Sequence, residues 1–290
     1  MTADRNELRL RPQKSFGALL APITRDELFA GVCILACANG LWGRVIMAVR
    51  EAGWSGAVFN LDISFIVLLA SAACVWLLLR EKSSPLQGTD LLVTMTCITL
   101  IILPIPALSW VAITALSIYI LLFATGSHSR KRAAIVMAAL TVPMLWIPLL
   151  IEFFQQPILE LDAMIVSWLI GSQHLGNLVA FKQGYGYVQI APPCSSITNL
   201  SLAFLCWVGV TQFENHRWSS VDILWVFLVC ASALAINVMR IGLVAQSREY
   251  YQVFHNQYWN ETSMVANVLT MIFAILFSVL GVRRELFSRA

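Results

Sequence analysis

The chain has 290 residues, of which 59% are hydrophobic and only 12% are charged. Soluble globular domains carry roughly 25% charged residues, so this composition excludes a soluble enzyme and leaves no room for a sizeable soluble domain. The net charge of +3 does not indicate nucleic-acid binding, because the basic residues stand where membrane topology needs them. We predict an all-α fold, a polytopic membrane helix bundle.

Apolar runs of about 20 residues mark the expected membrane spans. We predict eight of them, at residues 28–48, 63–79, 91–109, 111–127, 133–153, 196–213, 222–245 and 263–282. The first run is too long for the apolar region of a signal peptide, and no small-residue cleavage site follows it. The predicted regions are a cytoplasmic tail (1–27), a five-helix membrane region (28–153) and a C-terminal region (154–290) with an outer segment and three membrane helices.

The distribution of basic residues sets the expected orientation, because Lys and Arg favour the cytoplasmic side of a membrane. A cytoplasmic N-terminus puts most of the 19 basic residues inside, whereas Arg50, Lys182 and Arg248 fall outside. Both termini are then cytoplasmic, and segments 154–195 and 246–262 lie on the outer side. A seven-span arrangement separates the basic clusters less well.

The outer segment 154–195 has two expected parts. Residues 155–171 mix apolar and acidic side chains at roughly helical spacing, which predicts an interfacial helix on the outer surface. Residues 177–191 alternate around Gly184, which predicts a small hairpin.

One of the seven cysteines stands apart from the rest. Six lie inside predicted spans and fit the role of small apolar fillers. Cys194 lies in the polar joint "APPCSSITN", where two prolines precede it and Ser195 and Ser196 suit a helix start. A helix N-terminus stabilises a thiolate and presents backbone N–H groups to an oxyanion. We therefore expect the pKa of Cys194 to lie below the free-thiol value of about 8.5.

Arg240 is the second unusual residue, because it stands inside the seventh span, roughly 9 Å from the outer end at 1.5 Å per residue. An arginine at membrane depth is costly and marks a functional site by default. Asn237 lies three residues earlier, on the same helical face, and could orient the guanidinium. The alternative is that Arg240 snorkels to the outer headgroups.

Two histidines, His174 and His255, fall on the outer side. Cys194, Arg240 and His255 all approach the outer ends of the last three predicted spans. A cysteine nucleophile, a histidine that moves its proton and an arginine that steadies negative charge suit acyl transfer. Whether His174 or His255 carries the proton stays open.

Three sequence features together resemble the exosortase/archaeosortase family. These are "APPCSSITNLSLAF", then "NVMR" on the next span, then a histidine in the following outer loop. The similarity covers about residues 150–265. The chain has Pro193-Cys194-Ser195-Ser196 where the family commonly has Ala-Cys-Ser-Gly, which indicates a divergent subgroup.

The resemblance implies a membrane cysteine peptidase or transpeptidase with Cys194, Arg240 and His255 as its catalytic residues. Its partners would be exported proteins that end in a short motif such as Pro-Glu-Pro, a transmembrane helix and a basic cluster, together with membrane lipids. It would act at the outer face of a bacterial inner membrane, through a thioester and with no metal or organic cofactor.

Two other functions remain open at this point. One is a transporter with Arg240 as an anion ligand, although no inverted repeat is visible in the sequence. The other is a non-catalytic membrane component, for example of polysaccharide export, in which Cys194 is inert.

Overall fold

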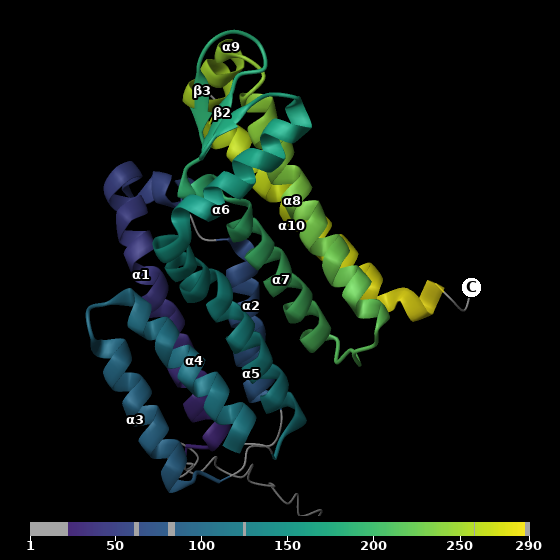
Figure 1. Ribbon diagram of the computed structural model, residues 1–290. Helices are drawn as coiled ribbons and strands as arrows, with labels where there is room; N and C mark the ends of the chain where they lie inside the picture. The colour runs from purple at the N-terminus through teal and green to yellow at the C-terminus, as the bar shows by residue number, and fades with distance from the viewer. Residues whose placement is uncertain (1–22, 61–63, 81–84, 124–125, 258, 288–290) are drawn as a thin grey trace, which may run out of the picture.

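The computed structural model describes residues 23–60, 64–80, 85–123, 126–257 and 259–287. The structure is built from helices and a very small sheet, which confirms the predicted all-α class (Figure 1). The helical elements are α1 (Arg25–Asn60), α2 (Phe65–Leu79), α3 (Gly88–Ile102), α4 (Pro106–Phe123), α5 (His128–Thr141), the π-helical η2 (Val142–Trp146), α6 (Ile147–Ile170), the 3₁₀ turn η3 (Pro192–Cys194), α7 (Ser196–Phe213), α8 (Val221–Val244), α9 (Arg248–Tyr251), the π-helical η4 (Gln252–Gln257) and α10 (Trp259–Phe287).

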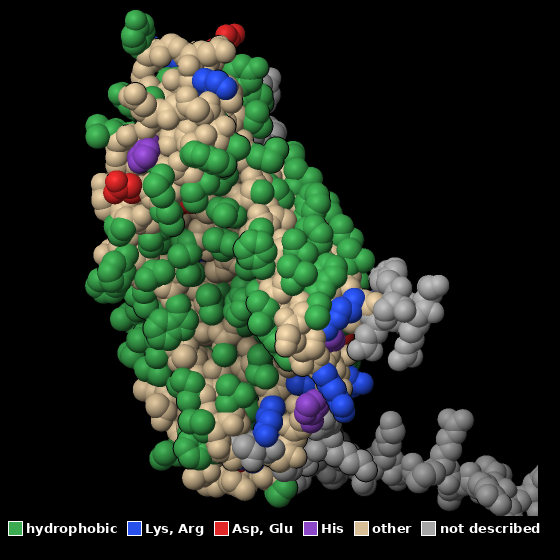
Figure 2. Space-filling model, turned by 45° about the vertical axis from the view of Figure 1, so that its right-hand side comes forward, with side chains coloured by type: hydrophobic (Ala, Val, Ile, Leu, Met, Phe, Trp, Pro, Cys, Tyr) green, Lys and Arg blue, Asp and Glu red, His purple; other side chains and the backbone are tan. Residues whose placement is uncertain are grey.

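In the described part of the chain, six helical stretches are long and apolar enough to cross a membrane. The apolar helices α2 and α3 have 15 residues each and rise only about 22 Å, less than the roughly 30 Å of a hydrocarbon core. Hydrophobic side chains cover the length of the bundle, and most Lys and Arg side chains in this view gather at one end (Figure 2). The protein is thus a membrane helix bundle.

The predicted fifth span and the predicted interfacial helix lie in one helical stretch, from His128 to Ile170, with a break at the predicted boundary between them. At 43 residues it is about 65 Å long, twice what a membrane needs. It bends at Phe154, whose φ of −127° and ψ of 32° are not helical. Pro157 explains the break, because proline has no backbone N–H to donate and its ring clashes with the carbonyl of the residue four positions earlier. Beyond the bend, α6 packs beneath the small sheet (Figure 1).

The sheet caps the end of the bundle at which α6 lies. Its three antiparallel strands, in spatial order, are β1 (His174–Leu175), β2 (Leu178–Ala180) and β3 (Tyr187–Gln189). Gly184 and Gly186 have φ values of 92° and 116° in the β2–β3 turn, a region that favours glycine. The predicted hairpin is confirmed. The amides of Lys182 and Gln183 donate to backbone carbonyls at the end of α8, which ties the cap to the bundle.

Buried ion pairs join the helix ends on the opposite side of the molecule. Arg25 Nη2 lies 2.5 Å from Asp90 Oδ1, and Arg130 Nε lies 2.5 Å from Asp26 Oδ1. An unpaired charge in such surroundings would be strongly destabilising. The start of α1 is therefore fixed to the starts of both α3 and α5.

The buried apolar residues form two clusters. The larger joins α1 to α5 with α7, α8 and α10, and the smaller lies between α6, the sheet and the cap end of α8. In the larger cluster, α10 approaches α7 and α8 at Gly281. A Cβ atom there would lie 2.7 Å from Trp207 Cζ3 and 2.8 Å from Trp225 Cγ.

Replacing Gly281 with alanine should therefore overpack this interface and lower the free energy of unfolding by about 1–3 kcal/mol. Thermal unfolding of the full chain in detergent measures the change. Gly209→Ala is the control, because no atom lies within 4 Å of its added Cβ. That variant should be neutral or stabilised by up to about 1 kcal/mol. A Gly281→Ala protein that melts no lower than Gly209→Ala would contradict the close helix contact.

Candidate active site

Cys194 ends a short 3₁₀ turn that leads from the cap into α7. The turn begins with Pro192 and Pro193, whose rings fix φ near −65° and pre-set its direction. Ser195 is the N-cap of α7 and has extended backbone angles of −66° and 135°. The predicted position of Cys194, beside a helix start, is thus confirmed.

The backbone amides around the thiol are already in use. Cys194 N–H donates to Ala191 O at 2.8 Å, and Ser195 N–H donates to Pro192 O at 3.1 Å. Ser196 N–H donates to Asp162 Oδ2 at 3.0 Å. The expectation that amides at this helix start wait for an oxyanion is therefore wrong for these three groups.

Asp162 is a residue of the site that sequence reasoning missed. It comes from α6, is 4% exposed, and its Oδ2 also accepts a hydrogen bond from Ser195 Oγ at 2.9 Å. A carboxylate at a helix N-terminus complements the helix dipole, so Asp162 stabilises the start of α7. A signal was present, because Asp162 falls on the buried stripe of α6 with Leu159 and Val166, whereas Glu160 is exposed.

Asn237 holds the other side of the turn. This α8 residue is 1% exposed, and its Nδ2 donates to Cys194 O and to Ser196 Oγ, both at 2.9 Å. Its Oδ1 accepts from Asn199 Nδ2 at 3.1 Å. The backbone of Cys194 is thus fixed between α6 and α8, and Asn237 acts on the turn that carries the thiol.

Arg240 lies one helical turn beyond Asn237 on α8, and only 8% of it is exposed. This burial contradicts the alternative in which its side chain snorkels to the headgroups. Its positive charge interacts with the thiol of Cys194 across the site. The structure thus joins Cys194 and Ser196 to Asn237 by hydrogen bonds and places Arg240 one helical turn from Asn237. The predicted grouping with His255 lies partly outside the described side chains.

The thiol itself is not activated in this structure. Burial raises the pKa of Cys194 above its usual value, and the nearby carboxylate of Asp162 adds to the increase. The positive charge of Arg240 and a hydrogen bond with the backbone of Ala191 both lower the pKa of Cys194. Together they offset only part of the effect of burial. The predicted lowering of this pKa is therefore wrong, and a base must remove the proton for the sulfur to react.

The two candidate histidines lie on different elements of the structure. His255 lies in the π-helical segment η4, and its side chain is outside the described part of the structure. Its neighbour Phe254 packs on the same apolar cluster as Cys194. His174 lies exposed on β1, with its Nδ1 atom 3.1 Å from Ser167 Oγ.

Neither a metal cluster in the described part of the chain nor a known relative adds to this description of the site. Among the described residues, no group of three or more His, Cys, Asp or Glu side chains is placed to hold a metal ion. No family model, curated protein or solved structure matches this chain. The resemblance to exosortases stays a prediction from sequence.

The pH dependence of thiol labelling tests the electrostatics of the site. With a membrane-impermeant alkylating reagent, the midpoint of Cys194 labelling should lie above the free-thiol value of about 8.5. Arg240→Met removes the charge that favours the thiolate, so its midpoint should rise further and labelling at pH 8 should slow severalfold. Asp162→Asn removes a negative charge and should lower the midpoint.

Arg240→Lys is the control, because it keeps the charge and should stay closer to the wild-type midpoint than Arg240→Met does. The Cys194→Ala protein supplies the background from the other cysteines. Equal midpoints in the Met and Lys variants would contradict an electrostatic contact between residues 194 and 240.

Proposed function

We propose that the protein is a membrane-embedded cysteine peptidase or transpeptidase of the exosortase type, which cleaves C-terminal sorting signals of exported proteins. The observation that carries this proposal is a cysteine on a turn held by Asn237 and Asp162, with a buried arginine, Arg240, one helical turn from Asn237. Burying Arg240 at membrane depth is costly, and a role in stabilising negative charge during acyl transfer explains why the chain keeps it there.

The same proposal includes eight spans, with both termini in the cytoplasm and the cap in the periplasm of a bacterial inner membrane. The helices α2 and α3 overlap the second and third predicted spans, which supports the count of eight. The third span ends earlier than predicted, at Ile102, because α4 already begins at Pro106 and contains Ser109 and Trp110. The gathering of Lys and Arg at the end away from the cap supports the orientation (Figure 2).

The chemistry follows from the groups at the site. His255 takes the thiol proton, and Cys194 Sγ attacks the carbonyl carbon of the scissile peptide bond, forming a C–S bond. Arg240 stabilises the resulting oxyanion. The C–N bond then breaks, the leaving amine takes the proton from His255, and a thioester remains. An amine or a water then attacks the thioester carbonyl carbon and gives up a proton to His255. The new C–N or C–O bond forms, the C–S bond breaks, and the proton passes from His255 to the sulfur, which restores the thiol.

Positioning residues keep the nucleophile in place for this attack. Asn237 and Asp162 hold the turn from both sides, so the position of the sulfur depends only on the side-chain rotation of Cys194. Because burial raises the pKa of the thiol, the enzyme rests in a neutral form until the base acts. A thiol that is neutral at rest also resists unwanted oxidation or alkylation.

Cys194→Ala should abolish processing of a co-expressed substrate that ends in a Pro-Glu-Pro motif, an apolar helix and a basic cluster. The wild type should yield a truncated product on an immunoblot and a hydroxylamine-sensitive adduct on the full-length protein. Cys230→Ala is the control, since Cys230 is half-buried in α8 and has no place in the mechanism. Processing by Cys194→Ala would end the thioester mechanism.

The same processing assay should distinguish the roles of His255 and His174. His255→Ala should reduce processing by about 100-fold or more, because the thiol then lacks its base. His174→Ala should retain most activity, since it removes only a contact with Ser167 at the cap. Loss of processing in His174→Ala alone would move the proton carrier to His174.

A further inference from the structure

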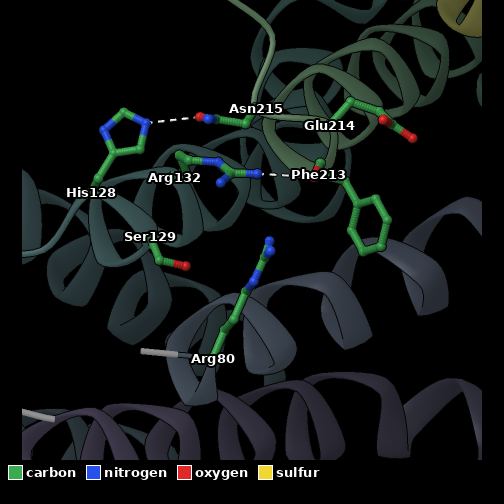
Figure 3. Close-up of a pocket in the computed structure, with 7 residues that line it drawn as sticks. All are labelled: Arg80, His128, Ser129, Arg132, Phe213, Glu214 and Asn215. Atoms are coloured by element: carbon green, nitrogen blue, oxygen red, sulfur yellow. Dashed lines mark hydrogen bonds between the residues drawn. The ribbon is translucent and has the colours of Figure 1, made fainter. Parts of the chain in front are cut away.

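A positively charged pocket lies at the end of the bundle opposite the cap. It has a volume of about 450 Å³ and is formed by the end of α2, the start of α5 and the end of α7 (Figure 3). Its basic side chains are Arg80, His128 and Arg132. The mechanism proposed for Cys194 uses none of them.

Arg132 and Arg80 come from different helices and meet in this pocket. Arg132 is 6% exposed, and its guanidinium donates to the carbonyls of Gln212, at 2.6 Å from Nε, and of Phe213, at 2.9 Å. Arg80 is exposed and lies over the Trp76 ring, 4.7 Å from its centroid. Its side chain extends toward Arg132 (Figure 3). Two guanidinium groups that face the same space favour an anion between them.

The acidic side chain at the pocket does not cancel this charge. Glu214 pairs with Arg283 at 3.3 Å, and its carboxylate points away from the two arginines (Figure 3). His128 Nε2 lies 2.8 Å from Asn215 Oδ1, which holds the imidazole at the pocket wall. The pocket thus offers the positive charges of two guanidinium groups, and the imidazole of His128 beside them, to an anion with several oxygens.

An apolar groove of about 510 Å³ lies between α1 and α2. Ala72, Val75, Trp76 and Leu79 of α2 line it. Ala72, Trp76 and Arg80 follow one another at four-residue spacing, so they lie along one stripe of the helix. The Trp76 ring also contacts the Phe213 ring of the pocket, with centroids 4.8 Å apart. Trp76 of the groove thus contacts Phe213 and Arg80 of the pocket, so the two cavities are neighbours.

We propose that the pocket and groove together bind an anionic phospholipid, with its phosphate at Arg80 and Arg132 and one acyl chain along α2. The pocket lies at three helix ends, the depth at which lipid phosphates occur in a bilayer. Trp76, Leu79 and Phe213 are 42%, 53% and 46% exposed, so the groove opens sideways to the lipid. Basic pockets between membrane helices bind acidic headgroups in this way.

Titration of the purified full chain in neutral detergent, followed by native mass spectrometry, tests the proposal. Dioleoyl phosphatidic acid should bind at least about fivefold more tightly than dioleoyl phosphatidylcholine, which has the same chains. Arg80→Gln should weaken phosphatidic acid binding about fivefold, since it removes one cation near the phosphate. Ala72→Phe fills the groove without changing charge and should weaken binding of the same lipid.

Arg217→Gln is the matched control, because Arg217 is exposed in the loop after α7 and does not line the pocket. It should leave lipid affinity unchanged. Equal weakening by Arg80→Gln and Arg217→Gln would indicate general charge attraction and overturn the proposal. Competition by millimolar inorganic phosphate, with no effect of Ala72→Phe, would indicate a free-phosphate site and overturn it as well.

Discussion

The carboxylate of Asp162 is the interaction on which the candidate site depends. It accepts hydrogen bonds from the side chain of Ser195 and the backbone of Ser196, and so joins the kinked helix α6 to the first turn of α7. A carboxylate that is only 4% exposed is tolerated because these donors and the helix dipole satisfy it. Asn237 completes the arrangement from α8, and Cys194 lies on the turn between the two.

The two ends of the bundle solve the problem of polar groups near a membrane in different ways. At the cap end, mostly neutral donors and one carboxylate satisfy each other around the turn, and Arg240 is buried beside them. At the other end, oppositely charged side chains pair across helices, as Arg130 does with Asp26. The first arrangement leaves a charge and a thiol close to each other, whereas the second fixes helix positions. The candidate site and the ion pairs that position the helices thus lie at opposite ends of the molecule.

Sequence reasoning reached the helices, the hairpin and the grouping of Cys194 with Arg240, because these depend on local composition and on the order of the spans. It also reached the break at Phe154 that Pro157 causes, but not the fact that helix runs up to the break on one side and on from it on the other, from His128 to Ile170. It also missed Asp162, which acts on residues more than 30 positions away in the chain. The raised pKa of Cys194 follows from burial by that packing, which a local helix-dipole argument leaves out.

The buried pairs at the start of α1 have a consequence for biogenesis. Arg25 and Asp26 are adjacent in the chain, but their partners Asp90 and Arg130 follow 65 and 104 residues later. During translation the first helix therefore leaves the ribosome long before either of its counter-charges has been synthesised. The buried packing at the start of α1 can therefore form only after α3 and α5 have both been synthesised.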